Sequence, residues 1–236
     1  MFKLDLGKNF FLFNKKNKLE KYLINEILTI ENVRNKPSFI ISGGTSLNSF
    51  FLKLAKIKLS FSIILSDERI VEKDSLLSNQ RNVFNIINKE TYKSNINIIS
   101  ADKAAINMKN KLICELFEKK IKKLSRVDFG IISVGADGHF ASIFSQNNKK
   151  LYKSKNFLIS KNKSDYFKKL SFNFEYFINL KKIYFIIKNI SKSVILTKII
   201  TQSKKDTLLP IIKLLNARGE NKENIFLVNK ECYKNL

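Results

Sequence analysis

The sequence predicts a single α/β domain over residues 1–236, with a mostly parallel, Rossmann-like sheet covered by helices on both faces. Short runs rich in Ile, Val and Phe alternate with longer segments whose apolar residues follow helical spacing. The short runs are apolar at nearly every position, which is typical of strands buried on both faces. This alternation of strands and helices indicates a parallel sheet between two helical layers.

Short apolar runs are expected to form the strands of this sheet. They are bounded by glycines or by charged residues, where the chain leaves the apolar interior. The expected strands span residues 38–41, 61–65, 96–99, 129–134, 183–187 and 225–228.

Longer segments between these runs carry the apolar spacing of helices. The expected helices span residues 19–33, 45–56, 79–88 and 103–124. Pro37 breaks the pattern after the first of them, and Thr45 or Ser46 can cap the second. By contrast, residues 145–169 are rich in Lys, Asn and Ser and weakly patterned, so we expect a long loop there.

The composition favours a globular chain that stays outside the membrane. Hydrophobic residues make up 44% of the sequence, which is enough for a sizeable core. No uncharged apolar run reaches the roughly 18 residues of a transmembrane helix. The N-terminus also lacks the apolar stretch of a signal peptide. We therefore expect a soluble, cytoplasmic protein with no membrane partner.

Cysteine and histidine usage argues against a metal site. Cys114 and Cys232 are far apart and match no metal-binding or redox spacing. Together with one histidine they cannot supply a structural zinc site. We expect free thiols in a reducing compartment, and neither a metal nor a cofactor.

The net charge of +24 raises nucleic acid as an alternative partner. Only five of the 44 basic residues are arginines, however, and Lys, Asn, Ile and Phe are all abundant. Those four residues have AT-rich codons, so a biased genome explains the charge most simply. Arginine is preferred for bidentate recognition of phosphates and bases. We expect no nucleic-acid partner, although the charge can attract an anionic substrate.

Two glycines follow the strand at residues 38–41. Gly43 and Gly44 let the backbone turn sharply and approach a ligand, and a helix begins at Thr45 or Ser46. The free N–H groups of a helix N-terminus suit phosphate. The alternative is an ordinary turn between a strand and a helix. The motif is neither a P-loop nor a complete dinucleotide fingerprint.

Three charged residues, Asp67, Glu68 and Arg69, directly follow the next strand. Charges at the end of a buried strand are costly unless they are exposed or paired. In open α/β sheets, ligands bind beyond the carboxyl ends of strands, which makes this segment a candidate for substrate binding. The alternative is a solvated loop with an Asp–Arg salt bridge.

The only histidine lies in a third segment beyond a strand end. His139 follows Asp137 and Gly138, and Gly135 ends the apolar run. Histidine is the side chain best suited to proton transfer near neutral pH. Its place between a glycine and an expected helix start favours function over simple packing. A Ser-His-Asp triad fits poorly, because no Gly-x-Ser-x-Gly elbow is present.

The three segments, in this order, resemble the 6-phosphogluconolactonase family. That family shows a Ser-Gly-Gly-Ser/Thr turn, an Asp-Glu-Arg segment with a downstream Ser-Asn, and Gly-x-Asp-Gly-His-x-Ala-Ser-x-Phe. The corresponding residues here are 42–45, 67–69 with 78–79, and 135–144. The resemblance covers most of the chain. Lys169 stands where the family has an arginine, and Lys192 matches a Gly-x-x-Lys pattern that here lacks its glycine.

The resemblance implies hydrolysis of 6-phospho-D-glucono-1,5-lactone to 6-phospho-D-gluconate, a step of the oxidative pentose phosphate pathway. His139 would be the general base for water attack on the carbonyl, and Asp137 would orient its ring or hold a sugar hydroxyl. Arg69 would stabilise charge on the carbonyl oxygen or hold the phosphate. The implied substrate-binding residues are Gly43, Gly44, Thr45, Asp67, Lys169 and Lys192. The expected partner is the phosphorylated sugar lactone, bound by a monomer or homodimer.

Glucosamine-6-phosphate deaminases share this fold and the Asp-Gly-His element, and they remain the nearest alternative. They continue with Phe-Asn-Glu-Pro, whereas this chain continues with Ser-Ile-Phe-Ser at residues 142–145. The acidic residue of the deaminase motif is therefore missing here.

Overall fold

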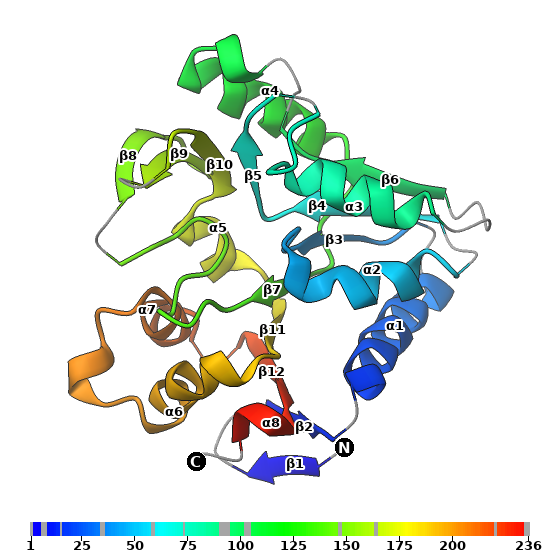
Figure 1. The fold of residues 1–236 in the computed structure, drawn as a ribbon, viewed down its shortest axis with the longest axis vertical. Coiled ribbons are helices and arrows are strands. Elements are labelled where there is room, and N and C mark those ends of the chain that lie inside the picture. Colours follow the sequence, from blue (N-terminus) through cyan, green and yellow to red (C-terminus); the bar gives the residue numbers. More distant parts are fainter. Residues whose placement is uncertain are drawn as a thin grey trace.

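The structure, a computed structural model, describes residues 2–5, 9–14, 16–33, 36–57, 60–72, 74–89, 95–101, 105–145, 148–162, 165–219 and 221–233. One large sheet runs between two groups of helices (Figure 1). Its strands, in spatial order, are β1 (Phe2–Asp5), β2 (Asn9–Phe13), β12 (Glu223–Asn229), β11 (Lys182–Ile187), β7 (Phe129–Ser133), β3 (Ser38–Ile41), β4 (Ser60–Leu65) and β6 (Asn95–Ile99). Only β1 runs antiparallel to its neighbour. The mostly parallel sheet is confirmed.

Helices cover both faces of this sheet, as expected (Figure 1). One face packs on α1 (Lys16–Val33), α2 (Asn48–Leu54) and α3 (Asn79–Ile87). The other packs on α4 (Asn110–Lys122), α5 (Phe174–Asn179), α6 (Ser193–Thr201), α7 (Pro210–Ala217) and α8 (Lys230–Tyr233). Within β3, Phe39 and Ile41 belong to the first layer and Ile40 to the second. Both faces of the strand are buried, which is why its sequence is continuously apolar.

A second, smaller sheet corrects one expectation. It is antiparallel and consists, in spatial order, of β5 (Asp67–Ile70), β10 (Lys168–Phe172), β9 (Phe157–Asn162) and β8 (Asn148–Lys153). The long loop expected over residues 145–169 is therefore wrong. Phe157 of β9 is buried against Phe117 of α4, with ring centroids 5.0 Å apart. Residues 157–160 of β9 are all buried, but this apolar run is short and lysine-rich segments surround it, so the sequence pattern did not reveal the strand.

The structure also differs from the sequence-based expectation at one helix start, at the first two strands and in the C-terminal helices. The helix expected over residues 103–124 is wrong at its start. Residues 105–107 form a short 3₁₀ helix, α4 begins at Asn110, and residues 102–104 lie outside the described part. The edge strands β1 and β2 and the helices α5 to α8 were not expected. None of the described helices is both long and apolar enough to cross a membrane.

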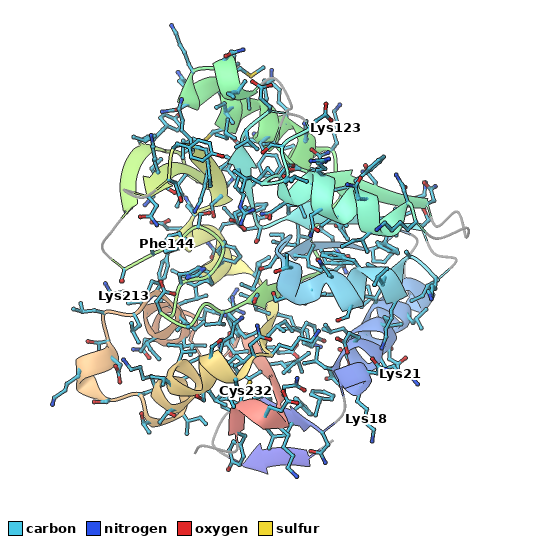
Figure 2. All side chains as sticks on the ribbon, viewed as in Figure 1. Lys18, Lys21, Lys123, Phe144, Lys213 and Cys232 are labelled. Carbon is cyan, nitrogen blue, oxygen red and sulfur yellow. The ribbon has the colours of Figure 1, made fainter. Side chains whose placement is uncertain are left out.

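Many lysines lie on solvated faces of this fold. Figure 2 shows Lys18, Lys21, Lys123 and Lys213 extending outward from the ribbon, and all four are exposed. The few charged side chains that are buried are therefore the ones that need a structural or functional reason.

The connections of two central strands create a crevice. β3 and β7 are neighbours in the middle of the sheet. From β3 the chain passes to β4 on one side, and from β7 it passes eventually to β11 on the other. Where connections leave adjacent parallel strands in opposite directions, the space beyond their carboxyl ends is the usual ligand site of an open α/β sheet.

Aromatic stacking joins three strands of the sheet and gives a stability prediction. The ring of Phe226 lies 4.5 Å from that of Phe10 and 5.1 Å from that of Phe185. All three rings are fully buried. Phe226→Ala should lower the free energy of unfolding by roughly 3–5 kcal/mol, because it leaves a cavity. Phe84→Ala removes a ring that is 54% exposed. That control should change stability by no more than about 0.5 kcal/mol. Urea unfolding monitored by circular dichroism compares them, and equal losses would contradict this packing.

Candidate active site

A cavity of about 400 Å³ lies beyond the carboxyl ends of β3 and β7. The turn after β3, the start of β5, the N-terminus of α3 and the loop after β7 all contribute to its wall. Seven predicted site residues line it, namely Gly43, Gly44, Thr45, Asp67, Arg69, His139 and Lys192. Asp137 and Lys169 lie beside the cavity rather than in its lining. Three segments that are far apart in the sequence therefore meet at one place.

The turn after β3 depends on glycine at one position. A Cβ atom on Gly43 would lie 2.7 Å from Cβ of Asn79, so no larger side chain fits. The Asn82 amide donates to the Gly43 carbonyl at 3.2 Å and holds the turn against α3. The expected capping by Thr45 or Ser46 is wrong. Thr45 begins a 3₁₀ helix whose cap position is Gly44, with no side-chain cap.

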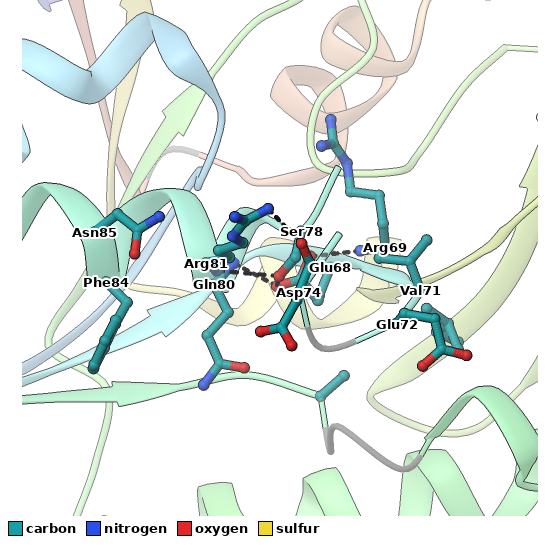
Figure 3. Close-up of a pocket in the computed structure, with 12 residues that line it drawn as sticks. Glu68, Arg69, Val71, Glu72, Asp74, Ser78, Gln80, Arg81, Phe84 and Asn85 are labelled. Atoms are coloured by element: carbon teal, nitrogen blue, oxygen red, sulfur yellow. Dashed lines mark hydrogen bonds between the residues drawn. The ribbon is translucent and has the colours of Figure 1, made fainter. Parts of the chain in front are cut away.

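The charged segment after β4 is the strand β5, and its residues alternate in direction. Asp67 and Arg69 line the cavity, whereas Glu68 points the other way and is 5% exposed. Glu68 accepts hydrogen bonds from the amides of Asn79 at 2.7 Å and Gln80 at 2.6 Å. It thereby caps the N-terminus of α3, and Figure 3 shows the hydrogen bond from Gln80. Burial raises the pKa of the Glu68 carboxyl, although these backbone donors oppose the rise.

Neither neighbour of Glu68 forms the salt bridge considered as an alternative. Among the described residues, Asp67 and Arg69 are not paired with each other. Asp67 accepts a hydrogen bond from Ser142 at 2.8 Å. The Arg69 guanidinium donates to the Leu77 carbonyl at 2.6 Å, and its buried Nε has no hydrogen-bond partner within the described part of the chain. Figure 3 shows this side chain extending away from Glu68. Arg69 therefore retains donors for an anion.

The loop after β7 is closed by backbone hydrogen bonds and shaped by glycines. The Gly135 amide donates to the His139 carbonyl at 2.8 Å, and the Gly138 amide donates to the Gly135 carbonyl at 3.0 Å. Gly138 has a φ of +79°, which favours glycine. The helix start expected after His139 is wrong, because isolated β-bridges at Phe140 and Ile143 follow instead.

This loop pairs the histidine with a carboxylate. Nδ1 of His139 lies 2.5 Å from Oδ1 of Asp137, and the Phe144 ring stacks on the imidazole at 4.4 Å. Burial acts to raise the pKa of Asp137, but the charge and hydrogen bonds of His139 lower it overall. An ionised Asp137 accepts the Nδ1 proton, which leaves Nε2 as the nitrogen able to accept another proton.

A buried ammonium group faces the same cavity. Lys192 is only 9% exposed, and its Nζ donates to the hydroxyl of Ser133 at 3.0 Å. Burial lowers the pKa of this lysine. No carboxylate of the described residues forms an ion pair with it. A buried cation without a counter-ion is costly, and an anionic ligand would stabilise it.

Lys169 has a different environment. Its Nζ lies 2.7 Å from Oδ2 of Asp165 and 5.3 Å from the centre of the Phe144 ring. It stands opposite Arg69 in the pairing of β10 with β5. This lysine is therefore near the predicted site, but a carboxylate already neutralises it.

Sequence reasoning missed several residues of the cavity wall. Ser133 and Asn82 line it, as does Asn79, which the family motif at residues 78–79 had marked without giving it a role. Ser133 had a usable signal, since it is the polar residue that ends the apolar run of β7. Asn82 had none, because polar residues in the first turn of a helix are common.

Comparison with known proteins agrees with this architecture. Residues 15–222 match the model of the family described as glucosamine-6-phosphate isomerases/6-phosphogluconolactonase. The chain belongs to this family. The resemblance found in the three sequence segments is thereby confirmed.

Two proteins and one crystal structure illustrate how much of this chain its relatives match. A 6-phosphogluconolactonase of Helicobacter pylori is 24% identical over 95% of this chain and 100% of its own length. A 6-phosphogluconolactonase of Thermotoga maritima is 31% identical, over 47% of this chain and only 51% of that protein. The crystal structure of a 6-phosphogluconolactonase from Shewanella baltica has a TM-score of 0.79 at 18% identity, covering 94% of this chain and 97% of that one. It shows that the fold is shared.

The glycine before the histidine loop gives a structural prediction. A Cβ on Gly135 would lie 2.2 Å from Nδ1 of His139, so Gly135→Ala should push the imidazole away from Asp137. Gly130→Ala, in the same strand region, would make only ordinary contacts of 3.4 Å or more. Because the chain has one histidine, its imidazole C–H signals in an NMR spectrum are unique. They should shift in Gly135→Ala and stay in place in Gly130→Ala. Unmoved signals in both variants would contradict the close approach.

Proposed function

We propose that this chain hydrolyses 6-phospho-D-glucono-1,5-lactone to 6-phospho-D-gluconate. The observation that carries the proposal is a single cavity lined both by the histidine of an Asp137–His139 pair and by Lys192, a buried cation without a described counter-ion. The first supplies a base and the second a place for a phosphate. The names of the relatives from Helicobacter pylori and Thermotoga maritima support the same activity.

In the proposed reaction His139 acts as general base. Its Nε2 takes a proton from water as the water oxygen attacks the lactone carbonyl carbon. Asp137 holds the ring through Nδ1 and stabilises the imidazolium that forms. The tetrahedral intermediate then collapses, the bond between the carbonyl carbon and the ring oxygen breaks, and the imidazolium returns the proton to that oxygen. Water is added across one ester bond, and the mechanism on these residues involves no redox step.

The remaining residues bind the substrate in this proposal. Gly43, Gly44 and Thr45 hold the phosphate with backbone groups, next to Lys192, which is joined to their turn through Ser133 and Ser46. Arg69 brings a second positive charge from β5, and Asp67 accepts a hydrogen bond from a sugar hydroxyl. Lys169 contributes less, because Asp165 already neutralises it.

The histidine gives the test of the activity. His139→Ala should lower lactone hydrolysis by roughly 10²–10⁴-fold, the usual contribution of a positioned acid–base group, while circular dichroism remains unchanged. Reporter 6-phosphogluconate dehydrogenase measures the product, and the spontaneous opening of the lactone is subtracted. Full activity in the folded variant would remove His139 from this role. Release of ammonia from glucosamine 6-phosphate by the wild type, without lactone hydrolysis, would favour the deaminase alternative.

The two lysines give a second test. Lys192→Met should raise KM for the lactone about tenfold or more, because a buried charged hydrogen bond contributes roughly 1.5–3 kcal/mol. Lys169→Met should raise it no more than about threefold, since that ammonium is already paired. Steady-state kinetics of both variants show which of the two lysines binds the phosphate. A larger effect at Lys169 would place the phosphate near β10 instead.

A further inference from the structure

A buried ion pair lies behind the turn formed by residues 43–46. Nζ of Lys188, just after β11, is 2.6 Å from Oε1 of Glu20 in α1, and their side chains are 14% and 2% exposed. The Ser49 hydroxyl of α2 donates to the same Oε1 at 2.7 Å and accepts from Lys188 at 2.7 Å. This network joins α1, α2 and the end of β11.

Stability alone does not account for this network. Moving two charges out of water costs several kcal/mol, and apolar residues of similar volume often serve as well or better. The other oxygen of the Glu20 carboxylate, Oε2, is buried and has no hydrogen-bond partner among the described residues. Such an unsatisfied buried oxygen is itself destabilising. A buried pair retained at this cost calls for another reason.

The network continues into the cavity. Lys188 Nζ also donates to the Ser46 carbonyl at 3.4 Å. The Ser46 hydroxyl donates to the Ser133 hydroxyl at 3.2 Å, and Ser133 accepts from Lys192 at 3.0 Å. Ser46, Ser133 and Lys192 line the cavity, whereas Glu20 and Lys188 do not. A continuous polar path therefore leads from the buried pair to the unpaired ammonium group.

The turn needs support of this kind. The 3₁₀ helix at Thr45–Leu47 has no side-chain cap, and neither does α2, which follows directly. At one end of the turn, the Asn82 side-chain amide donates to the Gly43 carbonyl. Lys188 contacts the opposite end, at Ser46. The carboxylate of Glu20 fixes the lysine, so that its ammonium group remains under the turn.

We infer that Glu20 and Lys188 are positioning residues, which set the distance between the turn at residues 43–46 and Lys192 to suit a phosphate group. The inference rests on the proposed function for the identity of the substrate. Neither residue touches the substrate. Their loss therefore weakens phosphate binding, which raises KM, and leaves the hydrolytic step at His139 intact.

The decisive variant removes both charges at once. Glu20→Met combined with Lys188→Met should unfold at the wild-type Tm or above it, because no buried charge is left unpaired. Its KM for the lactone should rise roughly tenfold with kcat changed less than about threefold, as displaced binding groups produce. The dissociation constant of inorganic phosphate, measured by calorimetry, should rise by the same factor.

The same two elements provide a matched control at the other end of the sheet. Glu26 of α1 and Lys182 of β11 form an ion pair at 3.2 Å, with side chains 28% and 25% exposed. Glu26→Gln combined with Lys182→Met keeps an acceptor for the buried Tyr184 hydroxyl and should leave KM and the phosphate affinity unchanged. An equal rise in this control would overturn the inference, since it would mean that any disturbance between α1 and β11 affects binding.

A charge exchange separates positioning from stability. Glu20→Lys combined with Lys188→Glu restores an ion pair but replaces the donor to the Ser46 carbonyl by an acceptor. We expect a folded protein with a KM that stays raised, whatever its Tm; a wild-type KM would overturn the inference. Should the double methionine variant fail to fold, this exchange still decides. A wild type that binds phosphate but hydrolyses no lactone would refute the proposed function, whereas the phosphate affinities would still test the positioning.

Discussion

The geometry of the candidate site depends on how the ends of β3 and β7 are joined. The Ser42 amide donates to the Ile131 carbonyl at 3.0 Å, and the Ser42 hydroxyl accepts from the Ser133 amide at 3.0 Å. These bonds extend the parallel pairing beyond the last residue of β3. Both glycine-containing turns therefore begin at the same level of the sheet and diverge from there. The sheet therefore determines where the two turns that line the cavity begin.

The charged groups around the cavity differ in how many hydrogen-bond partners the protein gives them, and this difference separates their roles. Glu68 accepts hydrogen bonds from three backbone amides and two hydroxyls, so it can serve only the structure. Arg69 has one strong backbone partner, and Lys192 donates to one serine hydroxyl. In a half-buried cavity the field of such an incompletely paired cation is weakly screened. An anionic ligand would therefore be attracted most strongly where the protein supplies the fewest counter-charges.

The sequence could predict those parts of the fold in which every position is constrained. Strands β3, β7 and β11 are buried on both faces, so their apolar runs were unmistakable. β9 is buried at four consecutive positions, but this run is short and lies between lysine-rich segments, which hid it. In the site, rarity was informative, because one histidine and seven glycines occur in the whole chain. Asn82 and Ser133 are ordinary residues locally, and only long-range contacts bring them to the cavity.

Lysine abundance limited what the sequence could say, and the structure shows why. Lys188 and Lys192 both follow β11 and are chemically identical, yet Glu20 neutralises the first and no described carboxylate pairs with the second. An ammonium group is a point charge whose effect depends on its neighbours, unlike the planar fork of arginine. The neighbour that distinguishes these two lysines lies in α1, near the start of the chain. The charge and hydropathy pattern around β11 does not separate the two lysines, and only the family resemblance singled out Lys192. The packing of α1 against β11 supplies the physical difference, because it pairs Lys188 with Glu20.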